Sequence, residues 1–280
     1  MHPPPRTNVP RISTRAIQGA VWLALSLPCA AHAMTDAPPD AVSDLAPRGT
    51  LRAAINFGNP VLAQKDPATG EPRGVSVDLA RELGKRLGVP VELVTFDAAG
   101  KVFDALQAGA WDVAFLAIDP ARSAGIEFTP PYVLIEGTYV VPSSSPLRRI
   151  EDVDREGVRI AVGRGSAYDL YLTRAVKHAK LVRADTSPLA LEKFLADRLE
   201  AAAGVRQPLL AFAKAHPDVR VLDGRFMAIE QAMGTPRGRA AGARYLRAFI
   251  ADALSSGFVA SGLARSGQGD VTIAPVPRGP

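Results

Sequence analysis

Hydrophobic residues recur along the chain in two alternating patterns. Apolar runs at 51–55, 90–94 and 112–117 contain few polar residues, which predicts buried strands. Between the first two runs, apolar residues recur every four positions over 75–87, and Gly88 follows them. This spacing predicts a helix with one buried face, and a second helix is expected over 101–108. Strands of this kind, separated by helices, indicate a parallel sheet covered on both faces.

The same order of elements starts again at residue 158. The chain therefore contains two α/β units that follow one another. The predicted strands of the second unit are 158–162, 180–184, 200–205 and 219–222, and its predicted helices are 166–177, 187–195 and 208–215.

Two further extended segments connect the units. They cover 137–141 and 227–234, and a long helix over 237–254 follows the second. If both segments cross between the units, that helix returns to the first one. The pattern therefore predicts an α/β protein of two lobes with a cleft and a two-stranded hinge, a frequent place for a ligand site. The predicted boundaries are a linker at 34–49, a first lobe at 50–138 plus 233–266, a second lobe at 139–232 and a flexible tail at 267–280.

The N-terminus has the features of an export signal. Three arginines precede an apolar run at 16–27, and Ala31-His32-Ala33 provides small residues two positions apart. We expect residues 1–33 to be a signal peptide cleaved after Ala33, which directs the mature chain to the periplasm. An uncleaved anchor and lipidation at Cys29 are the alternatives, although Pro28 stands where lipoprotein signals carry a small residue.

Composition and charge exclude several classes of protein. With 47% hydrophobic and 22% charged residues among 280, the chain can form a core, so disorder throughout is excluded. Its 33 basic and 28 acidic residues give +5, but three arginines lie before residue 34, which leaves 30 − 28 = +2. This excess is too small to indicate nucleic acid as a partner. The only cysteine is Cys29, which excludes cysteine-rich metal sites, and we expect no metal and no cofactor.

Five stretches carry a resemblance to a known family. The chain resembles the family 3 extracellular solute-binding proteins, the amino-acid-binding type of bacterial ABC uptake systems. The similarity implies a type II periplasmic-binding-protein fold, a small carboxylate or amino acid as ligand, an inner-membrane ABC permease as partner, a monomer, and no enzymatic activity. The matching stretches are GEPRGVSVDLARELGKRLGV at 70–89, ALQAGAWDVAF at 105–115, DPARSAGIEFTPPYV at 119–133, RIAVGRGSAYDLYL at 159–172 and, more loosely, 200–213.

The most specific of these stretches places an arginine at the expected cleft. Asp119 follows the strand that ends at Ala117 and precedes a proline, so it is placed to cap a short helix. Arg122 lies one turn into that helix. The resemblance implies that its guanidinium holds the α-carboxylate of the ligand. From the other lobe, Ser166 opens a helix after a glycine-rich turn, where backbone N–H groups favour an anion.

Other family positions are changed here. Relatives stack the ligand between two aromatic rings, but this chain has Asn59 and Ala98-Ala99 at the corresponding positions, so the stack is either absent or rebuilt from Phe57 or Phe115. Where relatives carry a carboxylate for the ligand amine, this chain has Arg206. The resemblance and these departures give a predicted ligand site of Asn56, Phe57, Lys101, Ala117, Asp119, Arg122, Glu136, Ser166 and Arg206.

The balance of charge at these positions predicts an anionic ligand, such as a small dicarboxylate or an acidic amino acid, in preference to lysine, arginine or histidine. Arg122, Arg206 and Lys101 would face a single carboxylate, Glu136, which is the one evident partner for an amine. Two other functions stay open at this point. One is a periplasmic dehydratase of the same fold, and the other is a ligand sensor with no transport role.

Overall fold

The computed structural model describes residues 1–3 and 37–277. The predicted signal peptide, its cleavage site and Cys29 lie outside the described residues, apart from residues 1–3. No single helix in the described part of the chain is long and apolar enough to cross a membrane, and one bent pair, Ala240–Ser255 with Phe258–Arg265, passes the same test by length and composition only.

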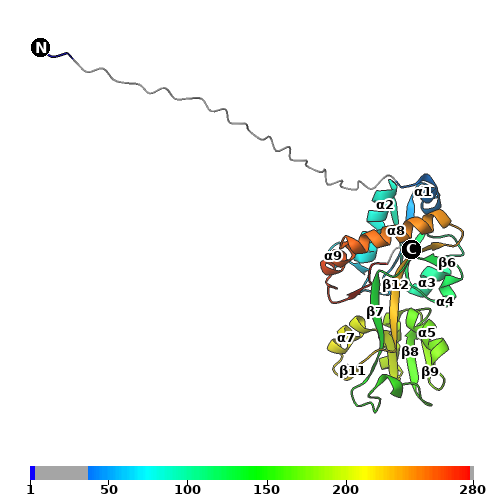
Figure 1. The fold of residues 1–280 in the computed structure, drawn as a ribbon. Coiled ribbons are helices and arrows are strands. Elements are labelled where there is room, and N and C mark those ends of the chain that lie inside the picture. Colours follow the sequence, from blue (N-terminus) through cyan, green and yellow to red (C-terminus); the bar gives the residue numbers. More distant parts are fainter. Residues whose placement is uncertain (4–36, 278–280) are drawn as a thin grey trace. The chain divides into compact units, whose positions relative to one another are not determined.

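One continuous sheet runs through the described chain, in the order β4-β1-β5-β12-β7-β10-β8-β9. Figure 1 shows its long strands β7 and β12 running side by side. At one end β1 pairs in parallel with β4 and β5, and at the other end β8 pairs in parallel with β9 and β10. We call the first group with its helices the first lobe and the second group with its helices the second lobe. The strands at the two ends are β4 (Val91–Phe96), β1 (Leu51–Asn56), β5 (Val113–Ala117), β10 (Ala201–Val205), β8 (Arg159–Gly163) and β9 (Lys180–Ala184).

Two long antiparallel strands, β7 (Val133–Pro142) and β12 (Met227–Pro236), join the lobes. The first half of each strand pairs with the other, from Val133↔Gln231 to Gly137↔Met227. Beyond that, β7 pairs with β10 and β12 pairs with β5. The two strands therefore cross between the lobes in opposite directions, as expected for a two-stranded hinge.

Helices cover both faces of the sheet in the first lobe. Leu51, Ala53 and Ile55 of β1 point to a core closed by α2, α8 and α9, whereas Ala54 points to the face covered by α3. This alternation follows from the period of two in a strand. The helices of this lobe are α1 (Pro39–Leu45), α2 (Val75–Leu87), α3 (Ala99–Asp104), α4 (Pro120–Ser123), α8 (Ala240–Ser255) and α9 (Phe258–Arg265).

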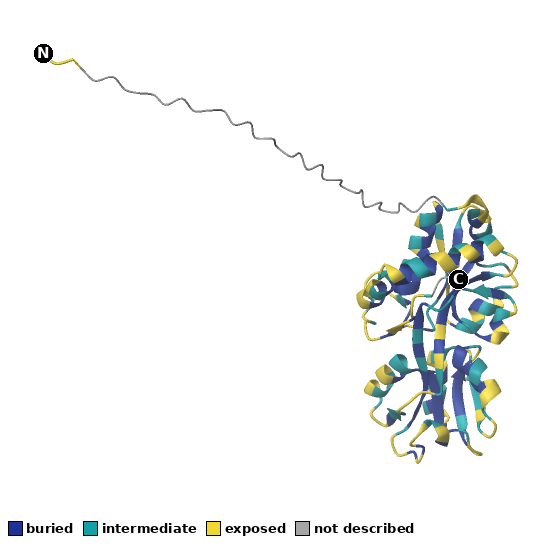
Figure 2. Cartoon of the chain, in the orientation of Figure 1, coloured by how far each residue is buried: buried dark blue, intermediate teal, exposed yellow. Residues whose placement is uncertain are grey.

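The second lobe repeats the arrangement. Ile160 and Val162 of β8 pack on α5, and Ala161 between them packs on the opposite face with α6 and α7. Figure 2 shows buried residues concentrated along the strands of both lobes. The remaining elements are α5 (Ala167–Ala175), α6 (Ser187–Ala196), α7 (Arg206–Ala215), the 3-10 helix η1 (Ile150–Asp152), and the short strands β2 (Gln64–Lys65), β3 (Pro72–Arg73), β6 (Ile126–Phe128), β11 (Val219–Val221) and β13 (Thr272–Ile273).

Two predicted segments differ from the structure. The linker expected at 34–49 contains α1, whose Leu45 is fully buried and whose Asp44 accepts a hydrogen bond of 2.9 Å from the backbone N–H of Gly242 in α8. The tail expected at 267–280 contains β13, which pairs with β7 at Val133 and Leu134. Both segments are too short for a periodic pattern to reveal, and both are held by contacts with distant parts of the chain.

Candidate ligand-binding site

A cavity of about 40 Å³ lies where the two lobes meet. Strands from both lobes end at it, and the hinge strand β12 borders it, which is the usual place for a ligand in open α/β sheets. Its lining residues are Asn56, Gly58, Asn59, Ala98, Ala99, Leu116, Ala117, Arg122, Gly163, Arg164, Ser166, Ala167, Tyr168, Ser187, Val205, Ile229 and Gln231.

Arg122 is the principal charge in this cavity. Its side chain is 1% exposed, and α4 holds it in place because Asp119 caps that helix, accepting from the N–H of Ala121 at 2.9 Å. The cap and the short helix confirm the local structure expected from Asp-Pro-x-Arg. Burial lowers the pKa of Arg122 to about 10. The guanidinium therefore keeps its charge at neutral pH.

The guanidinium of Arg122 connects the two lobes. Its Nη1 donates to the carbonyl of Ala117 at 2.9 Å, and its Nη2 donates to the carbonyl of Gly165 in the second lobe at 2.7 Å. Its Nε is buried and has no partner among the described residues. Since a guanidinium has five N–H groups, three remain available. Two of these can form the paired hydrogen bonds that a carboxylate accepts.

Two other contacts join the lobes beside Arg122. Arg174 of α5 pairs with Asp119 at 2.8 Å. A Cβ atom added to Gly100 in α3 would lie 2.8 Å from the carbonyl oxygen of Arg164 and 3.3 Å from the Cα of Gly165. The backbones of the two lobes therefore touch at a place that only glycine allows in this conformation.

Other predicted site residues also line the cavity. Asn56 and Ala117 end β1 and β5, and the Oδ1 of Asn56 accepts from the N–H of Gly58 at 2.9 Å. Ser166 caps α5, since its Oγ accepts from the N–H of Asp169 at 3.1 Å. The start of α5 therefore points at the cavity, as the glycine-rich turn before it indicated.

Glu136 and Arg206 differ from the prediction. Neither lines the cavity, because they pair with each other at 2.6 Å, and Glu136 also pairs with Arg225 at 3.0 Å. The cause is strand register: Val205 lies opposite Gly137 in the antiparallel pair of β10 and β7, so the next residues along, Arg206 and Glu136, come together. Arg206 hydrogen bonds chiefly lower the pKa of the Glu136 carboxyl. Arg206 and Glu136 therefore form an ion pair at the hinge, and neither side chain faces the cavity.

Three further predicted residues do not line the cavity. Lys101 pairs with Asp97 at 2.8 Å and is half exposed. Phe57 packs against the first-lobe core, with the ammonium of Lys65 5.5 Å from its ring centre. Asp119 is buried under its pair with Arg174 and acts through α4. The physical reason is the same in each case: a neighbour with a complementary surface holds the side chain elsewhere.

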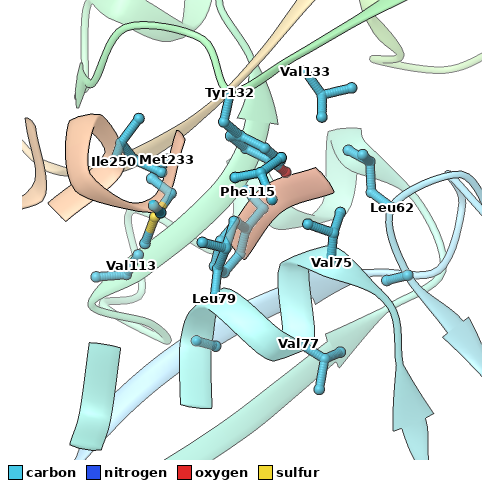
Figure 3. Packing of buried hydrophobic residues seen from close by; sticks show 14 of the residues in the cluster. Leu62, Val75, Val77, Leu79, Val113, Phe115, Tyr132, Val133, Met233 and Ile250 are labelled. Carbon is cyan, nitrogen blue, oxygen red and sulfur yellow. The ribbon is translucent and has the colours of Figure 1, made fainter. Parts of the chain in front are cut away.

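The aromatic ring at the cavity is Tyr168, which the sequence reasoning missed. Phe115, one of the two expected rings, lies in the first-lobe core with Tyr132, at 6.3 Å between ring centres (Figure 3). Tyr168 comes from α5 of the second lobe, and its hydroxyl donates to Ser187 Oγ at 2.6 Å. Burial raises the pKa of Tyr168, so the hydroxyl stays protonated. Its place two residues after the cap Ser166 was the signal that could have found it.

Asn59, Gln231 and Ser187 also line the cavity without having been predicted as ligand residues. Asn59 is 8% exposed, and its Oδ1 has no partner among the described residues. These side chains come from three separate elements, so no sequence spacing unites them. Within residues 1–3 and 37–277, no group of three or more His, Cys, Asp or Glu residues could hold a metal ion.

A family comparison agrees with this architecture. The bacterial extracellular solute-binding proteins, family 3, match residues 51–261, well over half of the chain. The chain belongs to this family. That membership confirms the resemblance drawn from the five stretches and the type II periplasmic-binding-protein fold. Because family 3 is a family of binding proteins, it also confirms the expectation that the chain is not an enzyme.

Individual family 3 relatives are distant in sequence. A glutamine-binding protein of Geobacillus stearothermophilus is 21% identical over 207 residues, which cover 72% of this chain and 79% of that protein. A solute receptor for L-cysteine from Neisseria gonorrhoeae has a TM-score of 0.70 at 23% identity, covering 80% of this chain and 92% of its own. An amino acid ABC transporter substrate-binding protein from Streptococcus pneumoniae, bound to L-arginine, has a TM-score of 0.69 at 17% identity, covering 84% and 99%. At these identities the solved structures support the fold.

Proposed function

We propose that this protein is the periplasmic substrate-binding component of an ABC uptake system for a small solute that carries a carboxylate, an amino acid or a related acid. Its partners are that solute and an inner-membrane ABC permease, and it acts as a monomer after cleavage of residues 1–33. The relatives described above are named for, or bound to, glutamine, L-cysteine and L-arginine, whose side chains differ but which share the α-carboxylate.

The observation that carries the proposal is the buried Arg122. A guanidinium that is 1% exposed and keeps three N–H groups is costly to bury unless an anion binds it. The cavity beside it is bordered by both lobes and by the hinge strand. A carboxylate bound there would contact both lobes and favour the closed arrangement.

A thermal-shift screen tests the proposal. Amino acids and small organic acids are added to the mature protein, and a ligand that binds the folded state raises the melting temperature by mass action. At least one carboxylate should stabilise the wild type and leave the melting temperature of Arg122→Ala unchanged. If no carboxylate stabilises the wild type, or if Arg122→Ala responds equally, the proposed site is wrong.

The role in transport needs a second measurement. Cells that lack the gene should lose uptake of the labelled carboxylate, and uptake should return with the wild-type gene and not with Arg122→Ala. Binding by the pure protein without any loss of uptake would favour the sensor.

A further inference from the structure

The cavity holds positive charge without an acidic residue. Among the described residues that line it, the charged side chains are Arg122 and Arg164, and none is Asp or Glu. An α-amino acid brings a carboxylate and an ammonium group. In this cavity the ammonium group would be desolvated near two arginines with no carboxylate to face it.

Three carboxylates of elements near the cavity are already held by arginines. Each of them is a few residues from a lining position, yet each is turned into an ion pair. The pairs are Asp119 with Arg174 at 2.8 Å, Asp169 with Arg183 at 2.9 Å, and Glu136 with Arg206 at 2.6 Å. Turning any of these acids toward a ligand would leave its arginine without that partner, so none is free to serve an ammonium group.

Because Arg206 does not line the cavity, the number of carboxylates expected on the ligand falls from two to one. With Arg206 paired to Glu136, Arg122 is the one buried cation that lines the described cavity, since Arg164 is 63% exposed and lies 3.6 Å from Asp185. One buried guanidinium matches one carboxylate. A second carboxylate on the ligand would have no buried cation of its own.

Neutral hydroxyl and amide groups complete the polar part of the site. Ser187 Oγ accepts from Tyr168 at 2.6 Å, so its own hydrogen can be donated to a ligand oxygen. Beside it, a recess of about 30 Å³ is lined by Tyr168, Ser187 and the apolar side chains of Leu191, Pro208 and Leu209. A short aliphatic group fits such a recess.

From these observations, and resting on the proposed function, we infer that the ligand is a small monocarboxylate with no ammonium group, of the 2-oxo or 2-hydroxy acid class. Arg122 holds the carboxylate. The hydroxyl of Ser187 donates to the oxo or hydroxyl oxygen, and the apolar recess takes the short chain.

Calorimetric titration with matched pairs tests the inference. The probes are pyruvate, L-lactate and L-alanine, and then 4-methyl-2-oxopentanoate and L-leucine, so that within each set only the group at Cα changes. The oxo or hydroxy acid should bind on the order of 30-fold more tightly than the amino acid, because no carboxylate lining the cavity faces the ammonium group. An amino acid that binds as tightly as its partner overturns the inference and leaves the proposed function intact. If no carboxylate binds at all, both are wrong.

A charge added to the cavity supplies an independent readout. Asn59→Asp places an acid at a lining position whose oxygen is buried without a described partner. The variant should shift the ratio of affinities toward L-alanine and away from pyruvate by tenfold or more. Gln64→Glu adds the same charge outside the cavity and should leave the ratio unchanged. If the ratio of affinities for L-alanine and pyruvate changes equally in Asn59→Asp and Gln64→Glu, or changes in neither, then the lack of a carboxylate in the cavity is not the cause of the preference for pyruvate.

Discussion

Gly100 touches the loop at Gly165 where the two lobes meet. We expect the substitution Gly100→Ala to weaken ligand binding and to leave the stability of the ligand-free protein unchanged or slightly higher. Gly100 is the second residue of α3 in the first lobe, and its neighbours across the interface are backbone atoms of the second lobe. In Gly100→Ala the new Cβ would lie 2.8 Å from the Arg164 carbonyl oxygen. The lobes must then stay apart by several tenths of an ångström, because backbone on the far side cannot rotate away.

The size of both effects follows from the two conformations. When the lobes are apart the methyl group meets no atom of the second lobe, and replacing a helical glycine stabilises the fold by roughly 0.4–1 kcal/mol. When the lobes are together the overlap costs about 1–3 kcal/mol. With ligand binding coupled to closure as proposed, this cost corresponds to about 5- to 150-fold weaker binding.

The assay compares calorimetric affinity with the melting temperature of the ligand-free protein. Gly100→Ala should melt at the wild-type temperature or slightly above it, and bind the ligand several-fold more weakly. Lys85→Ala in α2 is the control, since the side chain of Lys85 is exposed and does not line the cavity. Unchanged affinity in Gly100→Ala, or a fall in melting temperature together with affinity, would refute the reasoning.

Two further predictions concern the hinge pair and export. Arg206 lowers the pKa of Glu136 from its ordinary 4.5, so the pair stabilises the folded state above pH 4.5 and this contribution disappears as the pH falls below that value. Urea unfolding should show Glu136→Gln less stable than wild type at pH 7, by under about 1 kcal/mol because the carboxyl is 38% exposed, and this difference should narrow as the pH falls below 4.5. A difference that does not change with pH contradicts this. Intact mass of the exported protein should correspond to a chain that begins at Met34, whereas a mass that includes residues 16–27 would show an uncleaved anchor.

Local signals in the sequence predicted most of the secondary structure correctly. The helix expected over 75–87 is α2, and Gly88 ends it with φ 68°, the left-handed conformation that glycine allows. The cap at Asp119 was also predicted, because an acid before proline at the end of an apolar strand has few other roles. These features depend on residues close together in the chain.

Features that depend on register or distant contacts could not be predicted in the same way. The pairing of Arg206 with Glu136 follows from how β10 lies against β7, and no pattern within either strand reveals that alignment. The stretch at 271–274 is too short to show a period, yet β13 joins the hinge strand β7 there. The polar lining of the cavity likewise comes from elements that meet only in the folded chain.

Small-angle scattering tests most directly the central claim that the two lobes close on a carboxylate held by Arg122. The mature protein is measured alone and with a saturating amount of the carboxylate that raises its melting temperature most, and Arg122→Ala is measured under the same conditions. The radius of gyration of the wild type should fall on addition of the ligand, and that of Arg122→Ala should not change. A wild-type radius that stays the same with the ligand bound would contradict closure, and an equal decrease in Arg122→Ala would contradict the role of Arg122.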